Sequence, residues 1–306
     1  MEILFIILLA ILLDLTWGEV PASIHPVVLM GSLIEFLKPQ LLKINNKFSG
    51  IILALISLAL FTIPLYFILQ LLQFNLIIYI LISGFILFTT FAIKGLIGSV
   101  REVKEQLDTD INQARQSVSH LVSRDTDNLS REEITSAALE SLTENITDSV
   151  ISPLFYTFFL GVLGGMAYRV INTLDAMVGY KDMENIDIGW FPARLDDLAN
   201  YLPARITGVI MVISAAFMGL DWKSSYQTMN RDAHKTPSPN SGYPMAAAAG
   251  ALGVQLEKKG VYTLGERKNQ LNTDIIEQAI LLTQITIIFF ITISFIIYAF
   301  IIMIIN

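Results

Sequence analysis

The sequence predicts an all-α polytopic integral membrane protein with about four to six membrane segments, some short or re-entrant, and a cytoplasmic helical insert. Hydrophobic residues make up 54% of the 306 residues and charged residues only 15%, whereas soluble domains carry about 25% charged residues. Three uncharged runs, 51–72, 76–93 and 278–306, are long enough to cross a bilayer. We therefore treat residues 1–306 as a single membrane domain.

The first apolar run, residues 3–13, is too short for a full crossing and ends at Asp14. Either it is a half-crossing, or Asp14 lies inside the bilayer, where a carboxylate costs about 2.5–3.5 kcal/mol. Lysines and arginines flank the pair of runs 51–72 and 76–93, whereas the turn between them has none. The positive-inside rule therefore places both flanks in the cytoplasm.

Residues 100–148 are expected to form a cytoplasmic helical insert. Apolar residues recur at three- and four-residue steps from Val103 to Leu121, which is typical of an amphipathic helix. Residues 101–148 contain eleven acidic and five basic residues, so we do not expect them to lie on anionic lipid. Ser130 and Glu133 have the spacing of a capping box at the start of a second helix.

The middle of the chain alternates short apolar and polar segments. Residues 172–203 are expected as a polar motif loop, residues 221–275 as a cytoplasmic loop with seven basic residues, and residues 278–306 as the C-terminal membrane helix. Pro153 and three glycines divide the run 150–168. A full crossing there would separate its ends by about 28 Å. We expect this run to be re-entrant or broken, which would bring the polar segments on both sides of it to one site.

An acidic stripe at helical spacing precedes that run. Glu140, Glu144 and Asp148 follow one another at i, i+4 and i+8, beside Asn145. Like charges at this spacing cost about 0.2–0.5 kcal/mol per pair. Such a stripe would suit a Mg²⁺ ion that carries a phosphate substrate. The alternative is a solvated acidic face at the membrane border.

Two further clusters contain residues that could bind phosphate, a metal ion or another anion. Arg194, Asp196, Asp197 and Arg205 combine phosphate donors with metal ligands, although ion pairs in an interfacial loop would look the same. A proline-rich stretch, residues 234–244, precedes an alanine-rich helix start whose N–H groups could hold an anion; the alternative is a simple connector.

Several classes of site are not indicated. There is no cysteine, so disulfides and thiolate metal sites are excluded. The formal charge of −7 disfavours nucleic acid as a partner. No P-loop, Gly-x-Ser-x-Gly elbow or His-Glu-x-x-His pair is present. His25 precedes Pro26 and is either a structural hydrogen-bonding residue or a ligand.

Six segments in matching order, which together cover nearly the whole chain, resemble the membrane-bound adenosylcobinamide-phosphate synthase family of cobalamin biosynthesis. Two departures are Glu19, where the family usually has aspartate, and Met245, where many members have glutamate. The matching segments are 14–18 with His25, Pro26 and Gly31; 124–126; 140–153; 168–175 with Gly179 and Tyr180; 194–205; and 238–244 with Gly250.

The resemblance implies ATP-dependent amide ligation of adenosylcobyric acid with aminopropanol or its phosphate, giving adenosylcobinamide or its phosphate. It implies ATP as co-substrate, Mg²⁺, a corrinoid substrate, surrounding lipid, and an active site that faces the cytoplasm from the cell membrane. Homo-oligomers or other corrinoid-pathway enzymes are the protein partners left open. A transporter and a non-catalytic scaffold of the pathway are the alternative functions; a transporter would predict inverted repeats, which the sequence does not display.

Residue roles follow from this assignment as expectations. Asp175 is expected to take the proton from the incoming ammonium group. The catalytic set is Asp175, Glu144, Asp196 and Asp197. The metal set is Glu140, Glu144, Asp148, Asp196 and Asp197. The substrate-binding set is His25, Arg124, Asn145, Arg169, Asn172, Arg194, Arg205, Ser238 and Asn240.

Overall fold

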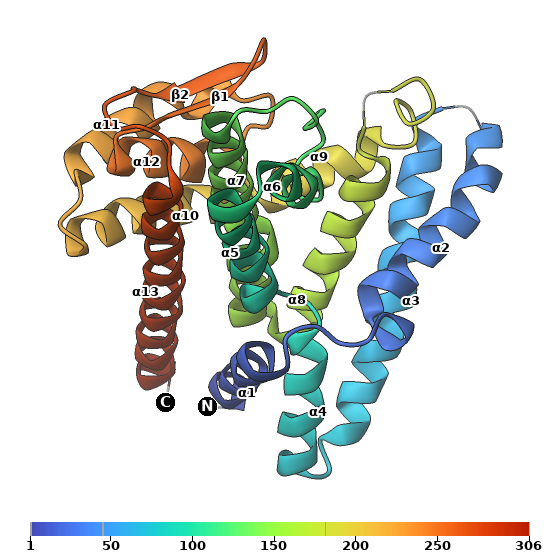
Figure 1. Ribbon diagram of the computed structural model, residues 1–306. Helices are drawn as coiled ribbons and strands as arrows, with labels where there is room; N and C mark the ends of the chain where they lie inside the picture. The colour runs from blue at the N-terminus through green and yellow to red at the C-terminus, as the bar shows by residue number, and fades with distance from the viewer. Residues whose placement is uncertain (1, 45, 181, 306) are drawn as a thin grey trace. The chain divides into compact units, whose positions relative to one another are not determined.

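The computed structural model describes residues 2–44, 46–180 and 182–305, and helices dominate these residues (Figure 1). The chain divides into two compact units, each built from two stretches of sequence. Unit 1 comprises Met1–Ile93 and Ser152–Asn200, and unit 2 comprises Lys94–Ile151 and Tyr201–Asn306.

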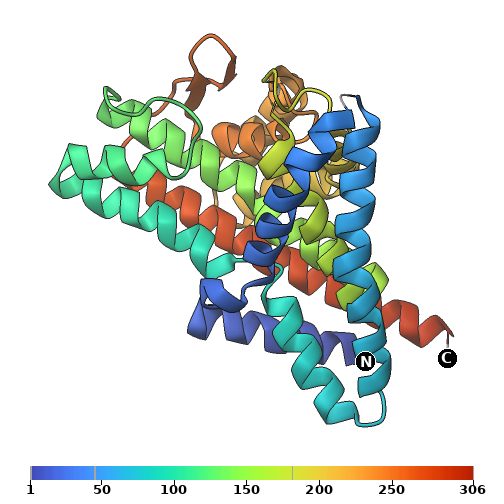
Figure 2. The same ribbon diagram turned by 90° about the vertical axis from the view of Figure 1, so that its right-hand side faces the viewer.

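Unit 1 is a helical bundle in which α8 packs on α2, α3 and α9, and α1 packs along α4 (Figure 2). Gly84 permits the close approach of α1 to α4, because a Cβ atom there would lie 2.7 Å from Leu9. Asn75 caps α4 after a short turn, as expected from the uncharged break in the sequence. The elements are α1 (Glu2–Trp17), η1 (Ala22–Ile24), α2 (Pro26–Leu41), η2 (Leu42–Ile44), α3 (Phe48–Leu72), α4 (Leu76–Phe88), α8 (Ser152–Val178) and α9 (Trp190–Ala199).

Unit 2 is centred on α12, whose alanine-rich sequence is buried along its whole length. It packs on α7, α10, α11 and α13 and on the two-stranded antiparallel hairpin. The elements are α5 (Ile93–Thr109), α6 (Ile111–Ser119), α7 (Arg131–Ile146), the π-helix η3 (Thr147–Ile151), α10 (Tyr201–Phe217), α11 (Trp222–Asp232), η4 (Ala233–Lys235), α12 (Gly242–Leu252), β1 (Gln255–Lys258), β2 (Tyr262–Gly265) and α13 (Thr273–Ile305).

The insert is helical with the expected buried face. Val103, Leu107, Ala114 and Val118 are all buried. The periodic stretch forms two helices, because the Asp110 side chain accepts a hydrogen bond from Asn112 N and starts α6 anew. The capping box at the start of α7 is present as predicted.

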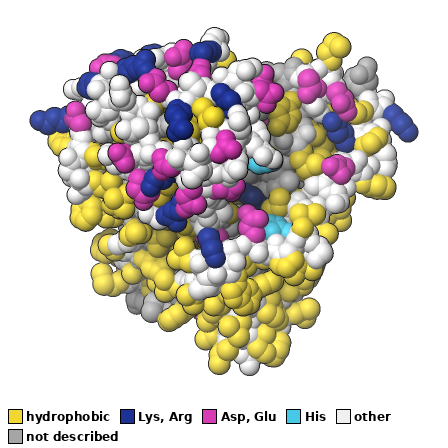
Figure 3. Space-filling model, viewed as in Figure 1, with side chains coloured by type: hydrophobic (Ala, Val, Ile, Leu, Met, Phe, Trp, Pro, Cys, Tyr) yellow, Lys and Arg dark blue, Asp and Glu magenta, His cyan; other side chains and the backbone are white. Residues whose placement is uncertain are grey.

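Within the described residues, four helical stretches are long and apolar enough to cross a membrane, and α9 with α10 adds a fifth if this bent pair is one span. The predicted class of all-α polytopic membrane protein is thus confirmed. Hydrophobic side chains cover the surface over α4 (Figure 3), including Leu76, Ile77 and Leu81. The four stretches are α3 (Phe48–Leu72), α4 with α5 (Leu76–Thr109), α7 with η3 and α8 (Arg131–Val178), and Thr273–Ile304 of α13.

Three middle segments differ in detail from the sequence expectation. Residues 150–168 belong to η3 and α8, and the helix is interrupted at Gly161, whose φ of 69° and ψ of −166° are not helical. Most of the predicted loop 172–203 is helical, in α8, α9 and α10. Residues 221–275 contain α11, α12 and the hairpin. The buried residues of α11 are mostly polar (Ser225, Thr228 and Asp232, with Met229), so this helix lacks the apolar stripe that predicts a helix.

Candidate functional site

The carboxylate of Glu140 on α7 is the centre of a buried polar cluster in unit 2. Only 4% of Glu140 is exposed. Its Oε1 accepts hydrogen bonds from Arg124 Nη2 at 3.0 Å and Ser136 Oγ at 2.8 Å. Its Oε2 accepts a hydrogen bond from the Tyr262 hydroxyl at 2.7 Å. Arg124, Ser136, Glu140 and Tyr262 form what we call the Glu140 cluster. A buried carboxylate is tolerated here because it is paired and hydrogen-bonded.

The β-hairpin and the loop before α7 position this cluster. Glu257 N donates a hydrogen bond to Ser136 Oγ at 3.2 Å, and Arg124 Nη1 donates one to Glu257 O at 3.2 Å. Leu256 and Leu264 are fully buried. Apolar burial and backbone hydrogen bonds therefore hold the hairpin beside α7.

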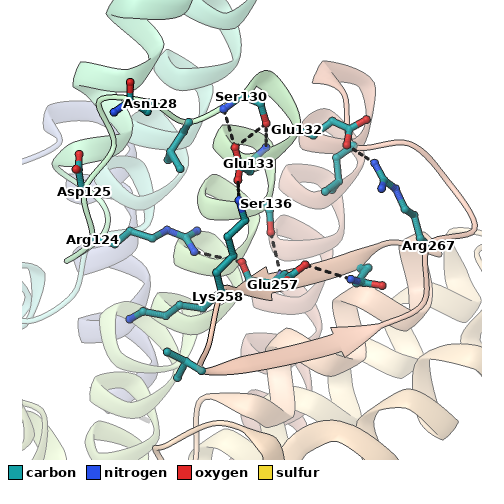
Figure 4. Close-up of a pocket in the computed structure, with 15 residues that line it drawn as sticks. Arg124, Asp125, Asn128, Ser130, Glu132, Glu133, Ser136, Glu257, Lys258 and Arg267 are labelled. Carbon is teal, nitrogen blue, oxygen red and sulfur yellow. Dashed lines mark hydrogen bonds and ion pairs between the residues drawn. The ribbon is translucent and has the colours of Figure 1, made fainter.

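A pocket of about 690 Å³ opens beside the cluster, with Arg124, Ser136 and Lys258 among its lining residues (Figure 4). Pockets for small molecules and cofactors usually have about 300–1,000 Å³. The volume therefore suits a ligand of nucleotide size.

Burial raises the pKa of Tyr262 above its usual value, and the charge of Glu140 and the hydrogen bond to it raise the pKa further. The phenol consequently remains protonated at neutral pH. It can act only as a hydrogen-bond donor toward Glu140.

The remainder of the acidic stripe is less buried. Glu144 is half-buried and hydrogen-bonded by the Ser241 side chain. Asn145 Nδ2 donates hydrogen bonds to Ser141 O and Oγ. Asp148 lies in the π-helix η3, which breaks the i, i+4 register of the stripe. π-Helical turns are frequent at functional sites.

Arg205, Ser238 and Asn240 lie together, as the substrate-binding prediction requires. Arg205 Nη1 donates a hydrogen bond to Asn240 Oδ1 at 2.8 Å, and its guanidinium lies over the rings of Tyr201 and Tyr243. Ser238 Oγ accepts a hydrogen bond from Asn240 N at 3.2 Å. Arg205 thus fixes the proline-rich loop; its role as a phosphate clamp stays a prediction.

Asp196 on α9 is the centre of a second polar network, in unit 1. Its Oδ1 accepts a hydrogen bond from Asn172 at 3.4 Å and its Oδ2 accepts one from Asn200 at 3.0 Å. Asn200 Oδ1 in turn accepts hydrogen bonds from Ser152 at 2.6 Å and Tyr168 at 2.9 Å. Asn200 therefore connects the first residue of α8 and a residue in its interior to the end of α9.

Further predicted residues of unit 1 surround this network. The side chains of Asp175 and Asp197 are close enough for their charges to act on Asp196. Arg169 Nη1 donates a hydrogen bond to Asn172 Oδ1 at 3.4 Å. Arg194 is exposed on α9. Four of these five residues thus gather as expected, and Arg194 lies on the surface.

His25 and Arg169 line a smaller pocket of about 200 Å³ together with Glu19. His25 caps α2, since its Nδ1 accepts a hydrogen bond from Val27 N at 3.2 Å. Burial and the charge of Arg169 lower the pKa of His25, while Glu19 opposes this shift. The imidazole is therefore neutral at pH 7 and has a structural role in addition to its place in the pocket.

A divalent metal ion was predicted among five carboxylates. Among the residues that the structure describes, no three His, Asp or Glu side chains converge as a preformed metal site. Mg²⁺ in phosphate-transfer sites commonly uses one or two carboxylates and completes its shell with water and substrate phosphate. Glu144, which is only half-buried, fits that donor set better than Glu140, because both oxygens of Glu140 already accept hydrogen bonds. The expectation that all five carboxylates share one site stays a prediction.

Sequence reasoning missed Tyr262 and Ser136 as site residues, whereas Asn200 lies within the predicted cluster 194–205. The four-residue spacing of Asp196 and Asn200 is a usable helical signal. By contrast, Tyr262 contacts a residue 122 positions away in the chain, so no local pattern could indicate it.

These features define a polytopic helical membrane protein with buried polar clusters. The chain belongs to the CobD/Cbib family, whose family model matches residues 7–299. It is 53% identical to the probable cobalamin biosynthesis protein CobD of Methanothermobacter thermautotrophicus, over 93% of this chain and 94% of the relative. It is 44% identical to the protein of the same name in Methanocaldococcus jannaschii (86% and 88%) and 41% identical to CobD of Dehalococcoides mccartyi (87% and 88%). No solved structure gives a significant match.

Proposed function

We propose that this protein acts in cobalamin biosynthesis as an ATP-dependent ligase that joins (adenosyl)cobyric acid to aminopropanol or its phosphate. Membership of the CobD/Cbib family and the names of its relatives support the pathway. The observation that carries the enzymatic assignment is the buried Glu140 cluster beside a pocket of nucleotide size. A scaffold has no need of a buried charged cluster at such a pocket.

The reaction needs activation because a carboxylate is a poor electrophile. A propionate oxygen would attack the γ-phosphorus of ATP and release ADP, forming an acyl phosphate. The neutral amine would then attack the acyl carbon, expelling phosphate and forming the amide. Positioning and charge neutralisation dominate such phosphoryl transfers.

The residues of this chain supply the required groups. Arg124 and Arg169 are proposed to hold phosphate or propionate oxygens through paired N–H donors. Asp175 is proposed to accept the proton from the ammonium group of the amine, which must be neutral to attack. Mg²⁺, when bound, would neutralise phosphate charge, and the half-buried carboxylate of Glu144 in unit 2 is its proposed protein ligand, with water and substrate phosphate completing the shell.

Purified protein tests this proposal against the two alternatives. In the presence of ATP, Mg²⁺, the corrinoid acid and the amine, a ligase produces amide together with nucleotide hydrolysis, and Asp196→Ala abolishes both. A transporter or scaffold produces neither in any variant. Asp187→Ala, outside both clusters, controls for expression and folding.

We also propose that the catalytic pocket faces the cytoplasm. The charge distribution around the membrane segments supports this orientation. Because the chain has no cysteine, a single cysteine at exposed Asn128 beside the pocket can be labelled without competition. A membrane-impermeant maleimide should label Asn128→Cys in opened cells and not in intact cells. Labelling in intact cells would reverse the orientation.

A further inference from the structure

Lys258 lies on the inner face of the β-hairpin. Side chains alternate along a strand, and Leu256 and Leu264, which are paired across the hairpin, are fully buried. Lys258 and Tyr262 are the next pair on that face. Tyr262 bonds to Glu140, so Lys258 stands beside the same carboxylate region of α7. Its neighbour Lys259, by contrast, is at the exposed turn.

Lys258 forms no ion pair with any residue that the structure describes. Among the described residues, its ammonium group has no carboxylate within 4.0 Å, although its charge acts on Glu144. The other three pocket cations are paired: Arg124 with Glu140, Lys259 with Glu133, and Arg267 with Glu132.

Arg124 lines the same pocket, and its guanidinium is held in place by Glu140 and by Glu257 O. Its Nη2 bonds to Glu140, but its buried Nε has no hydrogen-bond partner among the described residues. Buried polar atoms are normally satisfied. In Figure 4 the Lys258 side chain extends across the pocket below Arg124. An ammonium and a guanidinium that line one pocket of about 690 Å³ are suited to an anion with several oxygens.

We propose that Lys258 and Arg124 together bind a phosphate group of a substrate in this pocket. The inference rests on the proposed function and extends it to a residue that neither the sequence motifs nor the acidic stripe indicated. Two substrates of the proposed reaction can supply the group: the nucleotide, or the phosphorylated amino alcohol.

The test removes the charge of Lys258 while keeping a side chain of similar length. Lys258→Met should raise the KM of the phosphate-bearing substrate by about 10- to 100-fold, as expected for loss of a charge-assisted contact. Lys258→Arg should recover part of the affinity. Lys268→Met, which removes an exposed lysine outside the pocket, should leave every KM unchanged. If Lys258→Met does not fold, Lys258→Gln takes its place.

The two sources of phosphate give different patterns. If the nucleotide phosphate is bound, the KM of ATP rises with both aminopropanol and its phosphate. If the amine phosphate is bound, only the KM of the phosphorylated amine rises. KM values within twofold of the wild type for both substrates would overturn the inference.

A binding measurement separates this inference from the proposed function. Thermal stabilisation of the detergent-solubilised protein by Mg·ATP and by aminopropanol phosphate needs no turnover. Stabilisation of the wild type that is lost in Lys258→Met supports the phosphate site even if no amide forms. Normal stabilisation of Lys258→Met by both ligands refutes the phosphate site even if the wild type forms amide.

Discussion

The hydroxyl group of Tyr262 on β2 donates a hydrogen bond to Glu140 Oε2 on α7 over 2.7 Å. This contact ties the hairpin to the helix that carries the acidic stripe. It also satisfies an oxygen that the other two donors, Arg124 and Ser136, do not reach, because both bond to Oε1.

Removing the hydroxyl group of Tyr262 should therefore destabilise the packing of the hairpin on α7. Tyr262→Phe leaves one oxygen of a buried carboxylate unsatisfied, and we expect a loss of about 1–3 kcal/mol in unfolding free energy. Thermal unfolding in detergent measures the loss. Tyr226→Phe, at an exposed tyrosine of α11, should unfold like the wild type. An unchanged midpoint for Tyr262→Phe would show that the bond does not stabilise the hairpin.

Asn200 should be sensitive to a change that preserves its shape. In Asn200→Asp a donor that faces Asp196 becomes an acceptor, and two carboxylates then meet in a buried site. We expect destabilisation by at least about 2 kcal/mol and loss of ligase activity. The matched control is Asn112→Asp, at an exposed position of α6. Equal thermal midpoints of the two variants would contradict the role given to Asn200.

Two helical glycines should respond in opposite ways to alanine. A Cβ atom at Gly250 of α12 would lie 2.5 Å from Ser224 O and 2.8 Å from Ser225 Cα, so Gly250→Ala must push α12 away from α11. We expect a cost of about 1–3 kcal/mol. Gly98 of α5 has no atom within 4 Å of the added methyl group. Gly98→Ala should therefore gain about 1 kcal/mol from helix propensity. Thermal midpoints that move in the same direction would refute this contrast.

Asp232 should make the stability of unit 2 depend on acid pH. The carboxylate is fully buried, which alone would raise its pKa. Hydrogen bonds from Arg231, Lys235 and Gly265 N outweigh burial and hold the pKa at about 2. Because the folded pKa is lower than the unfolded one, the carboxylate contributes about 2 kcal/mol above pH 4 and loses it between pH 4 and pH 2.

The variant Asp232→Asn isolates that contribution. Its thermal midpoint should lie below that of the wild type at pH 7, and the difference should shrink as the pH falls toward 2. A difference that stays constant with pH would mean that ionisation of Asp232 does not stabilise the fold.

The sequence predicted those elements whose signals are local. Uncharged runs and the capping box at Ser130 located α3, α4, α7 and α13 within a few residues. Helices α9 and α11 were expected as loops, because their polar residues bond inside the fold and leave no apolar stripe.

The sequence predicted several residues of the candidate site but only some of the contacts between them. Arg124 and Glu140 were both predicted, and they form one ion pair. What the sequence could not indicate is that Glu140 is held by three donors, since Tyr262 comes from a hairpin 122 residues away. The contacts of Lys258 depend on the register of that hairpin, which hydrophobic periodicity does not fix in strands of four residues.

Transfer of an oxygen atom from the propionate carboxylate to the released phosphate tests the proposed ligation most directly. Corrinoid acid labelled with ¹⁸O in its free propionate carboxylate is incubated with the purified protein, unlabelled ATP, Mg²⁺ and the amine, and the released phosphate is examined by mass spectrometry. Activation through an acyl phosphate predicts one ¹⁸O atom in the phosphate for each amide formed, with the second ¹⁸O retained in the amide. Amide formation with unlabelled phosphate, or hydrolysis of ATP without amide, would contradict the account.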